Sequence, residues 1–352
     1  MIVRTFDQKT LRDYYGTILK AGSDLKTSAC CSSDENLSPR IKAALAELND
    51  EVLSRFYGCG SPLPPLLEDC TVLDLGCGAG RDAYLAARLA GPSGRVIGVD
   101  MTGQQLDVAR RNLDSQMKRF GYAKANVEFH QGFIEDLRAI GIEDGSIDVV
   151  ISNCVLNLSP DKRAVFSEIF RVLKPGGELF FADIFAGRRV PERFHSDPVL
   201  HGECLAGAMY REDFRRLVRD LGCLDHRVVT SRRIELNAPE IEAKIGMIDF
   251  HSVTVRAFKL NLEDICEDYG QVAIYKGTIP DWPHCFDLDD HHRFFTGKPK
   301  LVCGNTAAML QETRFADHFT VTGDRSVHYG AFDCNSGAGQ AAADSSTGGA
   351  CC

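Results

Sequence analysis

A strand-like run that leads directly into a glycine-rich turn is the feature that most constrains the fold of this chain. Val72, Leu73 and Leu75 form an apolar run, and GCGAGRD follows it with glycine at positions 76, 78 and 80. Glycine lets the backbone approach a ligand closely, and a helix after the turn would offer free N–H groups at its N-terminus. The next apolar run, RVIGVD, ends on Asp100, where a carboxylate can accept hydrogen bonds from ribose hydroxyls. The pattern predicts a nucleotide-binding strand–turn–helix–strand unit.

The region after this turn continues to alternate between strand-like and helix-like patterns. Strands are expected at residues 72–75, 96–99, 127–129, 149–152 and 178–184, with helices at 84–89, 104–120, 162–173 and 211–221. This alternation predicts an α/β fold with a parallel, doubly wound, Rossmann-like sheet. Strand-like runs with fewer helices follow at 230–330, including 252–260, 271–277 and 301–302, and indicate a smaller C-terminal α+β domain.

Four segments are predicted along the chain. Residues 1–70 are expected to be helical, because Ser38 can cap and Pro39 can open a helix that continues with helical spacing to Phe56. Residues 71–228 form the nucleotide-binding domain and residues 229–332 the α+β domain. Residues 333–352 are expected to be a disordered tail, because they are small and polar and end in two cysteines.

Composition excludes several classes of protein. The 40 Lys and Arg residues against 49 Asp and Glu residues give a net charge of −9, so we expect no nucleic-acid partner. No apolar run of about 18 residues and no secretory leader are evident, so we expect a cytoplasmic protein without a membrane contact. In that reducing compartment the 14 cysteines indicate reactive or ligand thiols, and the lack of a Cys-x-x-Cys pair argues against a zinc ribbon.

Two nucleotide cofactors compete for the glycine turn. The NAD fingerprint G-x-G-x-x-G would need glycine where this chain has Arg81. The spacing G-x-G-x-G after Asp74 instead resembles the class I S-adenosylmethionine methyltransferases. Three later segments resemble them as well: GFIEDL at 132–137, DVVISNCVL at 148–156 and VLKPGGELFFAD at 172–183.

The resemblance implies S-adenosylmethionine as cofactor, and it assigns the methionine, ribose and adenine parts of this molecule to particular residues. Asp74 would meet the methionine end, Gly76 and Gly78 would let the backbone approach, and Asp100 would take both ribose hydroxyls. Ile134 would cover the adenine, and Glu135 would accept from its amine. The expected cofactor-binding residues are Tyr57, Asp74, Gly76, Cys77, Gly78, Arg81, Asp100, Met101, Gln105, Ile134, Glu135 and Asn153.

Four cysteines lie in contexts that suggest chemistry. Cys30 lies in DLKTSACC, Cys59 in FYGCG, Cys154 at the end of the fourth expected strand, and Cys204 in HGECLAGAMY. Any one of them could be a packing residue, since cysteine is often buried. Cys77 lies in the glycine turn and Cys70 just before the first expected strand. The other cysteines are expected to pack or to lie on the surface: Cys223, Cys266, Cys285, Cys303 and Cys334.

Together these contexts resemble the arsenite S-adenosylmethionine methyltransferases. The resemblance runs from YYGTILKAGSDLKTSAC through FYGCG, DLGCGAGRD, GVDMT, SNCVLNL and LKPGG to GECLAGAMY, and extends more loosely to about residue 330. It implies that Cys30, Cys59, Cys154 and Cys204 are the functional cysteines, with adjacent Cys31 leaving the first assignment open. It also implies a detoxifying enzyme that methylates arsenite or its thiol conjugates, with a small-molecule or protein thiol as reductant.

The chemistry of arsenic agrees with thiol ligands. Trivalent arsenic is soft, prefers thiolates over oxygen, and keeps a lone pair after binding three sulfurs. Attack of that lone pair on the sulfonium methyl needs no general base. We expect the arsenic at Cys59, Cys154 and Cys204, with Cys154 and Cys204 as permanent ligands and with Cys30 and Cys59 as third ligand and redox partner.

Two other functions remain open from the sequence. A methyltransferase of a small organic metabolite would need a general base where this chain has Asn153 and Cys154. A non-enzymatic thiol sensor of soft metals would not need a cofactor pocket. The terminal Cys351–Cys352 pair could capture arsenic or be inert, and His291–His292 with Asp287, Asp289 and Asp290 is interpreted as a solvated turn rather than a metal site.

Overall fold

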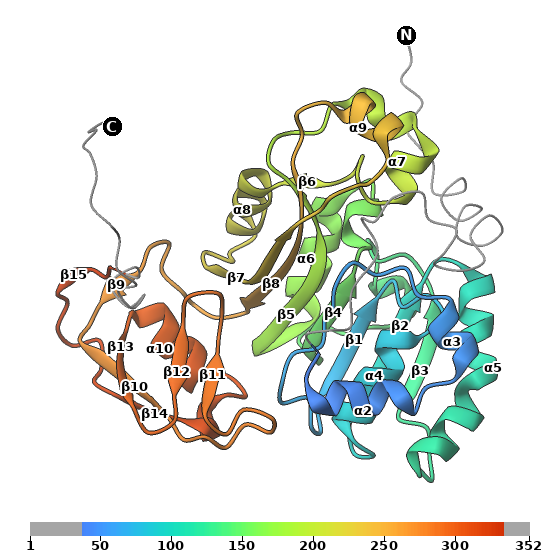
Figure 1. Ribbon diagram of the computed structural model, residues 1–352. Helices are drawn as coiled ribbons and strands as arrows, with labels where there is room; N and C mark the ends of the chain where they lie inside the picture. Colours follow the sequence, from blue (N-terminus) through green and yellow to red (C-terminus); the bar gives the residue numbers. More distant parts are fainter. Residues whose placement is uncertain (1–36, 334–352) are drawn as a thin grey trace.

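A central eight-stranded sheet carries the fold of residues 37–333, which are the residues that the computed structural model describes (Figure 1). The strand order is β3-β2-β1-β4-β5-β8-β7, and β6 pairs with β5 off this path. The parallel strands are β1 (Thr71–Leu75), β2 (Arg95–Asp100), β3 (Val127–Gln131), β4 (Ile147–Asn153), β5 (Leu173–Ala186) and β6 (Met209–Tyr210). The antiparallel strands are β7 (His226–Arg233) and β8 (Phe250–Phe258).

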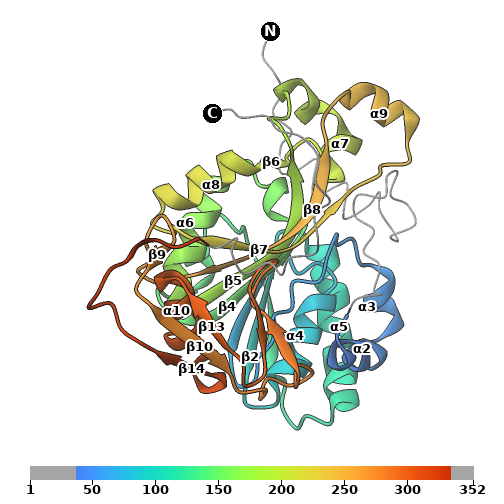
Figure 2. The ribbon, with the colours of Figure 1, turned by 60° about the vertical axis from the view of Figure 1, so that its left-hand side comes forward.

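Helices cover both faces of this sheet, as the doubly wound prediction requires (Figure 2). One face packs against α2 (Pro39–Ala46), α3 (Asp50–Ser54), α4 (Arg81–Ala90) and α5 (Gly103–Phe120). The other packs against α6 (Lys162–Val172) and α8 (Arg211–Asp220). Strands β1 and β4 are buried on both faces, which explains their nearly continuous apolar sequences.

The sheet continues past the predicted domain boundary at residues 228 and 229. That boundary falls inside β7. β7 pairs antiparallel with β8, and β8 pairs antiparallel with β5 from Phe258 at Glu178 to Phe250 at Ala186. The segment at 252–260, assigned from sequence to the C-terminal domain, therefore lies mostly in the main sheet. β7 and β8 run antiparallel and are joined through α9 (Pro239–Ile245). Antiparallel neighbours need no crossover helix on a face of the sheet, so the strand–helix alternation over the two faces ends before the sheet does.

The N-terminal helix begins as predicted but is interrupted. Ser38 caps α2, accepting a hydrogen bond from the Ile41 backbone at 3.3 Å. The helical spacing predicted one helix to Phe56, whereas Asn49 has an extended backbone and begins the separate helix α3. Gln116 of α5 bonds both sides of this break, to the Asn49 N–H at 3.0 Å and the Glu47 carbonyl at 2.8 Å.

Connections above the carboxyl ends of β5 and β7 form a third apolar cluster, which contains Cys59, Cys154 and Cys204. Its elements include α7 (Pro198–Gly202) and α9 (Pro239–Ile245), which lie together at the top of Figure 1. The short 3-10 turns are η4 (Arg138–Ile140), η5 (Leu156–Leu158), η6 (Glu192–Ser196) and η7 (Ala316–His318).

The C-terminal segment forms a smaller strand-rich unit with its own core. Strands β10 (Gln271–Tyr275), β13 (Pro299–Val302) and β14 (Phe319–Thr322) form one sheet, and α10 (Gly304–Gln311) packs against it. Two small pairs complete it: β11 (Cys285–Asp287) with β12 (Arg293–Phe295), and β9 (Glu267–Asp268) with β15 (Gly330–Ala331).

A buried ionic clamp joins this unit to the main sheet. Glu178 of β5 is 0% exposed and accepts a hydrogen bond from Arg256 of β8 at 2.5 Å. Arg314 forms a second ion pair with Glu178, and Arg256 also donates to the Leu288 carbonyl of the C-terminal unit. These ion pairs and hydrogen bonds therefore tie strands β5 and β8 of the main sheet to Leu288 and Arg314 of the C-terminal unit.

Candidate active site

A cavity opens at the carboxyl ends of β1, β2 and β4, where the strand order of the sheet reverses direction. This is the place where open α/β sheets bind ligands. All of the expected cofactor-binding residues line it: Tyr57, Asp74, Gly76, Cys77, Gly78, Arg81, Asp100, Met101, Gln105, Ile134, Glu135 and Asn153. Cys154 lines the same cavity, so the predicted cofactor and substrate residues meet there.

The glycine turn brings backbone to the wall of this cavity. The N–H groups of Gly76 and Cys77 donate to the Val99 carbonyl at 2.8 and 3.0 Å, which fixes the turn against β2. Gly78 has φ +52°, and a Cβ added there would meet no atom within 4 Å. The turn thus leaves open space beside Gly78, which suits the close approach of a ligand.

Asp74 has a buried oxygen that the protein does not satisfy. Its Oδ2 has no hydrogen-bond partner among residues 37–333, and the residue is 2% exposed. Burial raises the pKa of Asp74 well above its usual value, and the nearby Asp82 and Asp100 carboxylates raise it further. A ligand ammonium group would supply the missing donor and positive charge, so this carboxylate fits the amino end of S-adenosylmethionine.

Asp100 is held rigidly by backbone donors. Its Oδ1 accepts from the Thr102 N–H at 2.7 Å, and its Oδ2 accepts from the Gly78 N–H at 2.9 Å. Burial raises the pKa of Asp100, while these two N–H groups act in the opposite direction. Each carboxylate oxygen can accept a second hydrogen bond, which leaves positions for two ribose hydroxyls.

The far wall combines Glu135, an expected cofactor residue, with residues that the sequence analysis did not single out. Glu135 accepts a hydrogen bond from the Ser159 hydroxyl at 2.5 Å, and Phe133, beside Ile134, is 43% exposed. An exposed aromatic ring in a cavity wall offers a stacking surface. Its place inside the GFIEDL motif was the signal that could have identified it. Further lining residues not anticipated are Phe56, Asp82, Thr102, Val155, Leu158 and Ser159.

The side-chain amide of Asn153 makes all of its hydrogen bonds to other groups of the protein. Its Oδ1 accepts from the N–H groups of Cys59 and Gly60 at 3.0 and 3.3 Å. Its Nδ2 donates to the Gly60 carbonyl and to Asp82 Oδ2, both at 2.9 Å. An amide has two donors and two acceptor positions, so all four are occupied. The residue links the Cys59 loop to the cofactor cavity.

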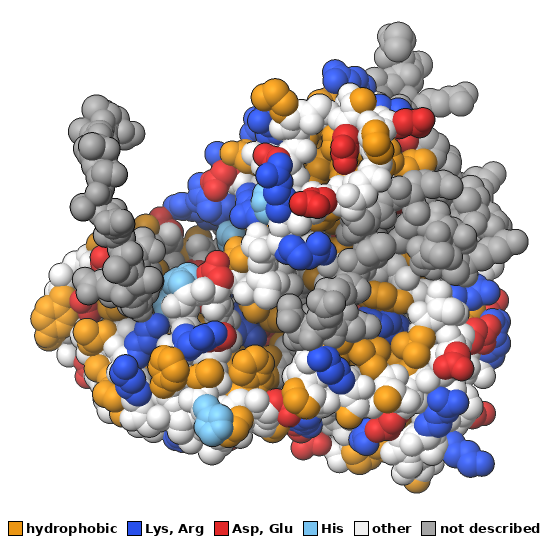
Figure 3. All heavy atoms as spheres, in the orientation of Figure 1, with side chains coloured by type: hydrophobic (Ala, Val, Ile, Leu, Met, Phe, Trp, Pro, Cys, Tyr) orange, Lys and Arg blue, Asp and Glu red, His pale blue; other side chains and the backbone are white. Residues whose placement is uncertain are grey.

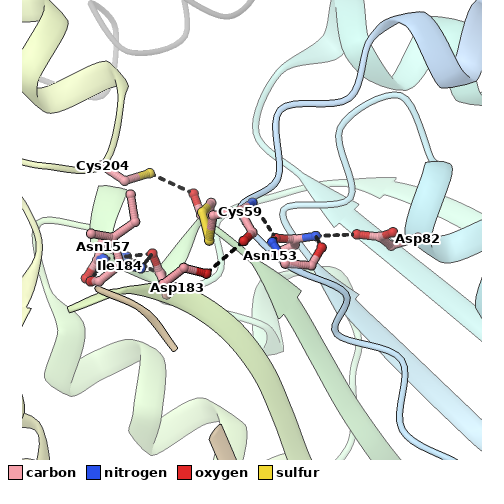
Figure 4. The surroundings of a disulfide bond; sticks show 10 residues. Cys59, Asp82, Asn153, Asn157, Asp183, Ile184 and Cys204 are labelled. Atoms are coloured by element: carbon pink, nitrogen blue, oxygen red, sulfur yellow. Dashed lines mark hydrogen bonds between the residues drawn. A yellow bond between two sulfur atoms is a disulfide. The ribbon is translucent and has the colours of Figure 1, made fainter. Parts of the chain in front are cut away.

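Cys59, Cys154 and Cys204 belong to one buried apolar cluster, and Figure 4 shows Cys59 and Cys204 on the two sides of the disulfide region. Cys59 and Cys154, 95 residues apart, form a disulfide, and the Cys204 thiol donates to the Cys154 carbonyl at 3.0 Å. Their exposed fractions are 2%, 3% and 0%. Cys154 and Cys204 have φ angles of +55° and +64°, a conformation that costs energy for residues with a side chain and is found at ligand clamps.

A carboxylate that the sequence analysis did not assign lies against these cysteines. An oxygen of Asp183 and the sulfurs of Cys59 and Cys154 lie within 4.8 Å of one another. Asp183 accepts from the Ile184 N–H at 2.8 Å and from the Asn157 side chain at 2.7 Å, and burial raises its pKa to about 7. Asp183 belongs to β5 and is distant from both cysteines in the sequence, so only the fold brings it beside them.

Cys59 also lines a second cavity, which does not include Cys154. This cavity lies between α2, the loop that follows Cys59, strands β7 and β8, and Trp282. Ser252 of β8 holds the Cys59 carbonyl from this side with a hydrogen bond of 2.8 Å. The disulfide therefore joins a residue of the cofactor cavity to a residue of a separate cavity.

Other predicted residues fall elsewhere or outside the described part of the chain. Cys30, Cys31 and the Cys351–Cys352 pair lie outside residues 37–333. Asp289 and His292 are buried and bonded to each other and to Arg227, whereas Asp290 and His291 are exposed, so only part of this turn is solvated. Burial of Asp289 and His292 is possible because Arg227 reaches them from β7.

The surface carries charge of both signs. On the face drawn in Figure 3, Lys and Arg side chains are interspersed with Asp and Glu side chains over the described residues. Within residues 37–333, the helices are too short or too polar to span a membrane.

Comparisons with known proteins cover nearly the whole chain. Residues 66–222 match the methyltransferase domain family, and residues 269–352 match the arsenite methyltransferase C-terminal domain family. The arsenite methyltransferase of Aquipseudomonas alcaligenes is 50% identical over 94% of this chain and 95% of its own length. That of Mus musculus is 41% identical over 89% and 83%. The crystal structure of CrArsM, an arsenic(III) S-adenosylmethionine methyltransferase from Chlamydomonas reinhardtii, is 53% identical and superposes with a TM-score of 0.82 over 84% of this chain and 100% of that one.

Proposed function

Because this chain belongs to the arsenite methyltransferase family, we propose that Cys59, Cys154 and Cys204 bind the trivalent arsenic that it methylates. The observation that carries this assignment is the convergence of the three buried cysteines beside the cofactor cavity. Three thiolates satisfy the three bonds of arsenite, and their sulfur is the ligand that a soft centre prefers. The alternatives of an organic substrate and of a non-enzymatic sensor are not favoured.

S-adenosylmethionine is the cofactor and supplies a methyl group on a positively charged sulfur. Asp74 would bind its ammonium group, and Asp100 would accept from its ribose hydroxyls. Ile134, Phe133 and Glu135 would enclose the adenine. Because Cys154 lines this cavity, arsenic on its sulfur would face the cofactor.

Closing a disulfide can return to arsenic the two electrons that methyl transfer formally removes from it. The arsenic lone pair forms the new carbon bond, which formally oxidises arsenic from the trivalent to the pentavalent state. Two thiolates can return two electrons by closing a disulfide, which restores trivalent arsenic. The Cys59–Cys154 bond is the disulfide that this step would leave, so Cys154 would release arsenic at this point rather than hold it through the whole cycle as expected from the sequence. Cys204 remains a thiol in that state and would retain its place beside Cys154.

The cycle then requires a thiol reductant, for which the second cavity offers an approach. A reductant thiolate attacking Cys59 from this cavity would release the Cys154 thiolate on the cofactor side. Cys30 of this protein and a small-molecule thiol are both candidates for this reductant. We place this chemistry in cytoplasmic arsenic detoxification, with arsenite or its thiol conjugate as substrate.

The function is tested by product chromatography. The protein, arsenite, excess thiol and S-adenosylmethionine are expected to yield methylated arsenicals and S-adenosylhomocysteine in matching amounts. Product formation should require all four components. Cofactor turnover without arsenic, or arsenic binding without methylated product, would contradict the assignment.

Asp100→Ala should weaken S-adenosylmethionine binding. The change removes a charged acceptor for the ribose hydroxyls, worth about 1.5–3 kcal/mol, or roughly ten- to hundredfold in affinity. Calorimetric titration measures the affinity, and Asp107→Ala on α5 provides a control acid outside the cavity lining. Unchanged affinity in Asp100→Ala would reject its role.

Asn153→Ala should slow methylation while leaving cofactor affinity within about threefold. The variant loses the hydrogen bonds of Asn153 to Cys59, Gly60 and Asp82. None of these three residues is among the expected cofactor-binding residues. We expect kcat to fall by about tenfold or more, since small displacements of reacting groups are costly. An equal loss of cofactor affinity would instead make Asn153 a cofactor-binding residue, as its sequence position suggested.

A further inference from the structure

The second cavity gives access to one end of the active-site disulfide. Its volume is about 350 Å³, which is in the range of cavities that bind small molecules. Cys59 lines this cavity and is 2% exposed, whereas its disulfide partner Cys154 lines the cofactor cavity. Because Cys59 is buried, a reagent that attacks its sulfur needs such a cavity to reach it.

The wall of the second cavity is apolar inside and positively charged where it meets solvent. Leu63, Leu67 and Phe180 line it and are at most 6% exposed. Arg232 of β7 also lines it and is exposed, so its charge lies at the open end. The cavity thus joins a cation at its mouth to a sulfur-bearing residue at its buried end.

Strand register places Arg232 near the Cys59 loop. Arg232 pairs with Ser252 of β8, and paired residues of antiparallel strands project from the same face of the sheet. The Ser252 hydroxyl donates to the Cys59 carbonyl at 2.8 Å. Arg232 is therefore the cross-strand neighbour of the residue that holds Cys59.

Arg232 is the cation of this cavity that has no acidic partner. Arg40, the other cation, forms an ion pair with Glu68 at 2.7 Å, and Asp281 accepts a hydrogen bond from the Arg40 N–H at 3.3 Å. The structure gives the Arg232 side chain neither an ion pair nor a hydrogen bond within residues 37–333. A guanidinium presents paired donors that match the two oxygens of a carboxylate.

We propose that the second cavity binds the reductant of the Cys59–Cys154 disulfide, and that this reductant is a small thiol whose carboxylate pairs with Arg232. The proposal rests on the proposed function, in which this disulfide closes in every cycle. It selects the small-molecule thiol over Cys30 as the group that attacks Cys59. The apolar wall would contact the carbon chain between the carboxylate and the thiol.

The exchange consumes two thiol molecules. The thiolate of the first attacks the Cys59 sulfur, a mixed disulfide forms, and the Cys154 sulfur leaves as a thiolate that takes up a proton. The second thiolate attacks the sulfur of the bound ligand, and the Cys59 thiolate leaves and is protonated. Two thiols are oxidised to one small disulfide while two electrons reduce the protein disulfide.

The test follows the protein disulfide without arsenic or S-adenosylmethionine. The oxidised full-length protein is mixed with 3-mercaptopropionate or with cysteamine, which carries an ammonium group instead of a carboxylate. Samples are quenched with acid, digested and mapped by mass spectrometry. We expect the mixed disulfide on Cys59, and we expect its rate of formation to saturate with rising 3-mercaptopropionate.

Variants of Arg232 measure the contribution of the carboxylate contact. Arg232→Ala should slow reduction by 3-mercaptopropionate about tenfold without slowing reduction by cysteamine, and Arg232→Lys should recover part of the loss. Each thiol is compared with itself across variants, so differences in intrinsic thiol reactivity cancel. Arg233→Ala is the matched control, because Arg233 pairs with Asp249 at 2.7 Å and does not line the cavity.

The outcomes separate this proposal from the proposed function. Equal rates with 3-mercaptopropionate in Arg232→Ala and wild-type protein, an equal loss in Arg233→Ala, or a first adduct on Cys30 or Cys154 would overturn the cavity as the reductant site. None of these results depends on methylation, which the product chromatography above tests by itself. A protein that methylates arsenite but shows no carboxylate preference would therefore refute only the reductant site.

Discussion

Cys204→Ser is expected to abolish methylation of both arsenite and methylarsenite. The Cys204 thiol is buried against the Cys154 carbonyl and stays reduced while Cys59 and Cys154 are joined, so it is the thiol available throughout the cycle. An oxygen ligand in its place binds soft arsenic poorly. Cys154→Ser should have the same effect, because Cys154 lines the cofactor cavity. Activity falls to background in both variants, as measured by chromatography of the methylated products.

Cys59→Ser should separate the two substrates. Methylarsenite needs only two protein thiols, so this variant should lose methylation of arsenite but keep methylation of methylarsenite when excess external thiol carries out the redox step. Cys30→Ser is expected to behave alike. Calorimetric cofactor affinity in each variant controls for damage to the neighbouring cavity. Equal loss on both substrates in all four serine variants would refute this division of roles, and full arsenite activity in Cys154→Ser would refute the arsenic site.

Glu178→Ala should cause the largest loss of stability. Glu178 is fully buried with Arg256 at 2.5 Å and with Arg314 as a second partner. Removing one partner of a buried ion pair leaves an uncompensated charge and costs about 3–5 kcal/mol. We expect the urea midpoint and the thermal midpoint to fall together, with the C-terminal unit losing protection from hydrogen exchange first.

The exposed ion pair between Glu212 and Arg215 provides the matched control for this prediction. Glu212→Ala should change stability little, because water already solvates both charges. Glu178→Gln keeps the shape and one acceptor oxygen, so its loss should lie between the two alanine variants. If Glu178→Ala unfolds at the same midpoint as Glu212→Ala, the clamp does not hold the domains together.

The residues of the cofactor cavity could be predicted because they belong to short motifs at the ends of consecutive parallel strands. Asp74 lies near the end of the first apolar run, Asp100 ends the second, and Glu135 follows the third. The parallel topology brings such ends to one edge of the sheet. The same local rules identified Ser38 as a helix cap. They failed at Asn49, where Gln116 from a distant helix bonds across the break and no spacing of apolar residues reports it.

Sequence by itself therefore determined the strand–helix alternation, the cofactor motifs and the family, since each depends on neighbouring residues or on recognisable segments. Only the tertiary structure decided the pairing of β7 and β8 with the main sheet, the joining of Cys59 to Cys154, and the position of Asp183 beside them. It also decided that Cys303 lies among the donors of Arg227 and Thr306. These contacts join residues distant in the chain, and their formation depends on how whole elements pack, which local spacing does not encode.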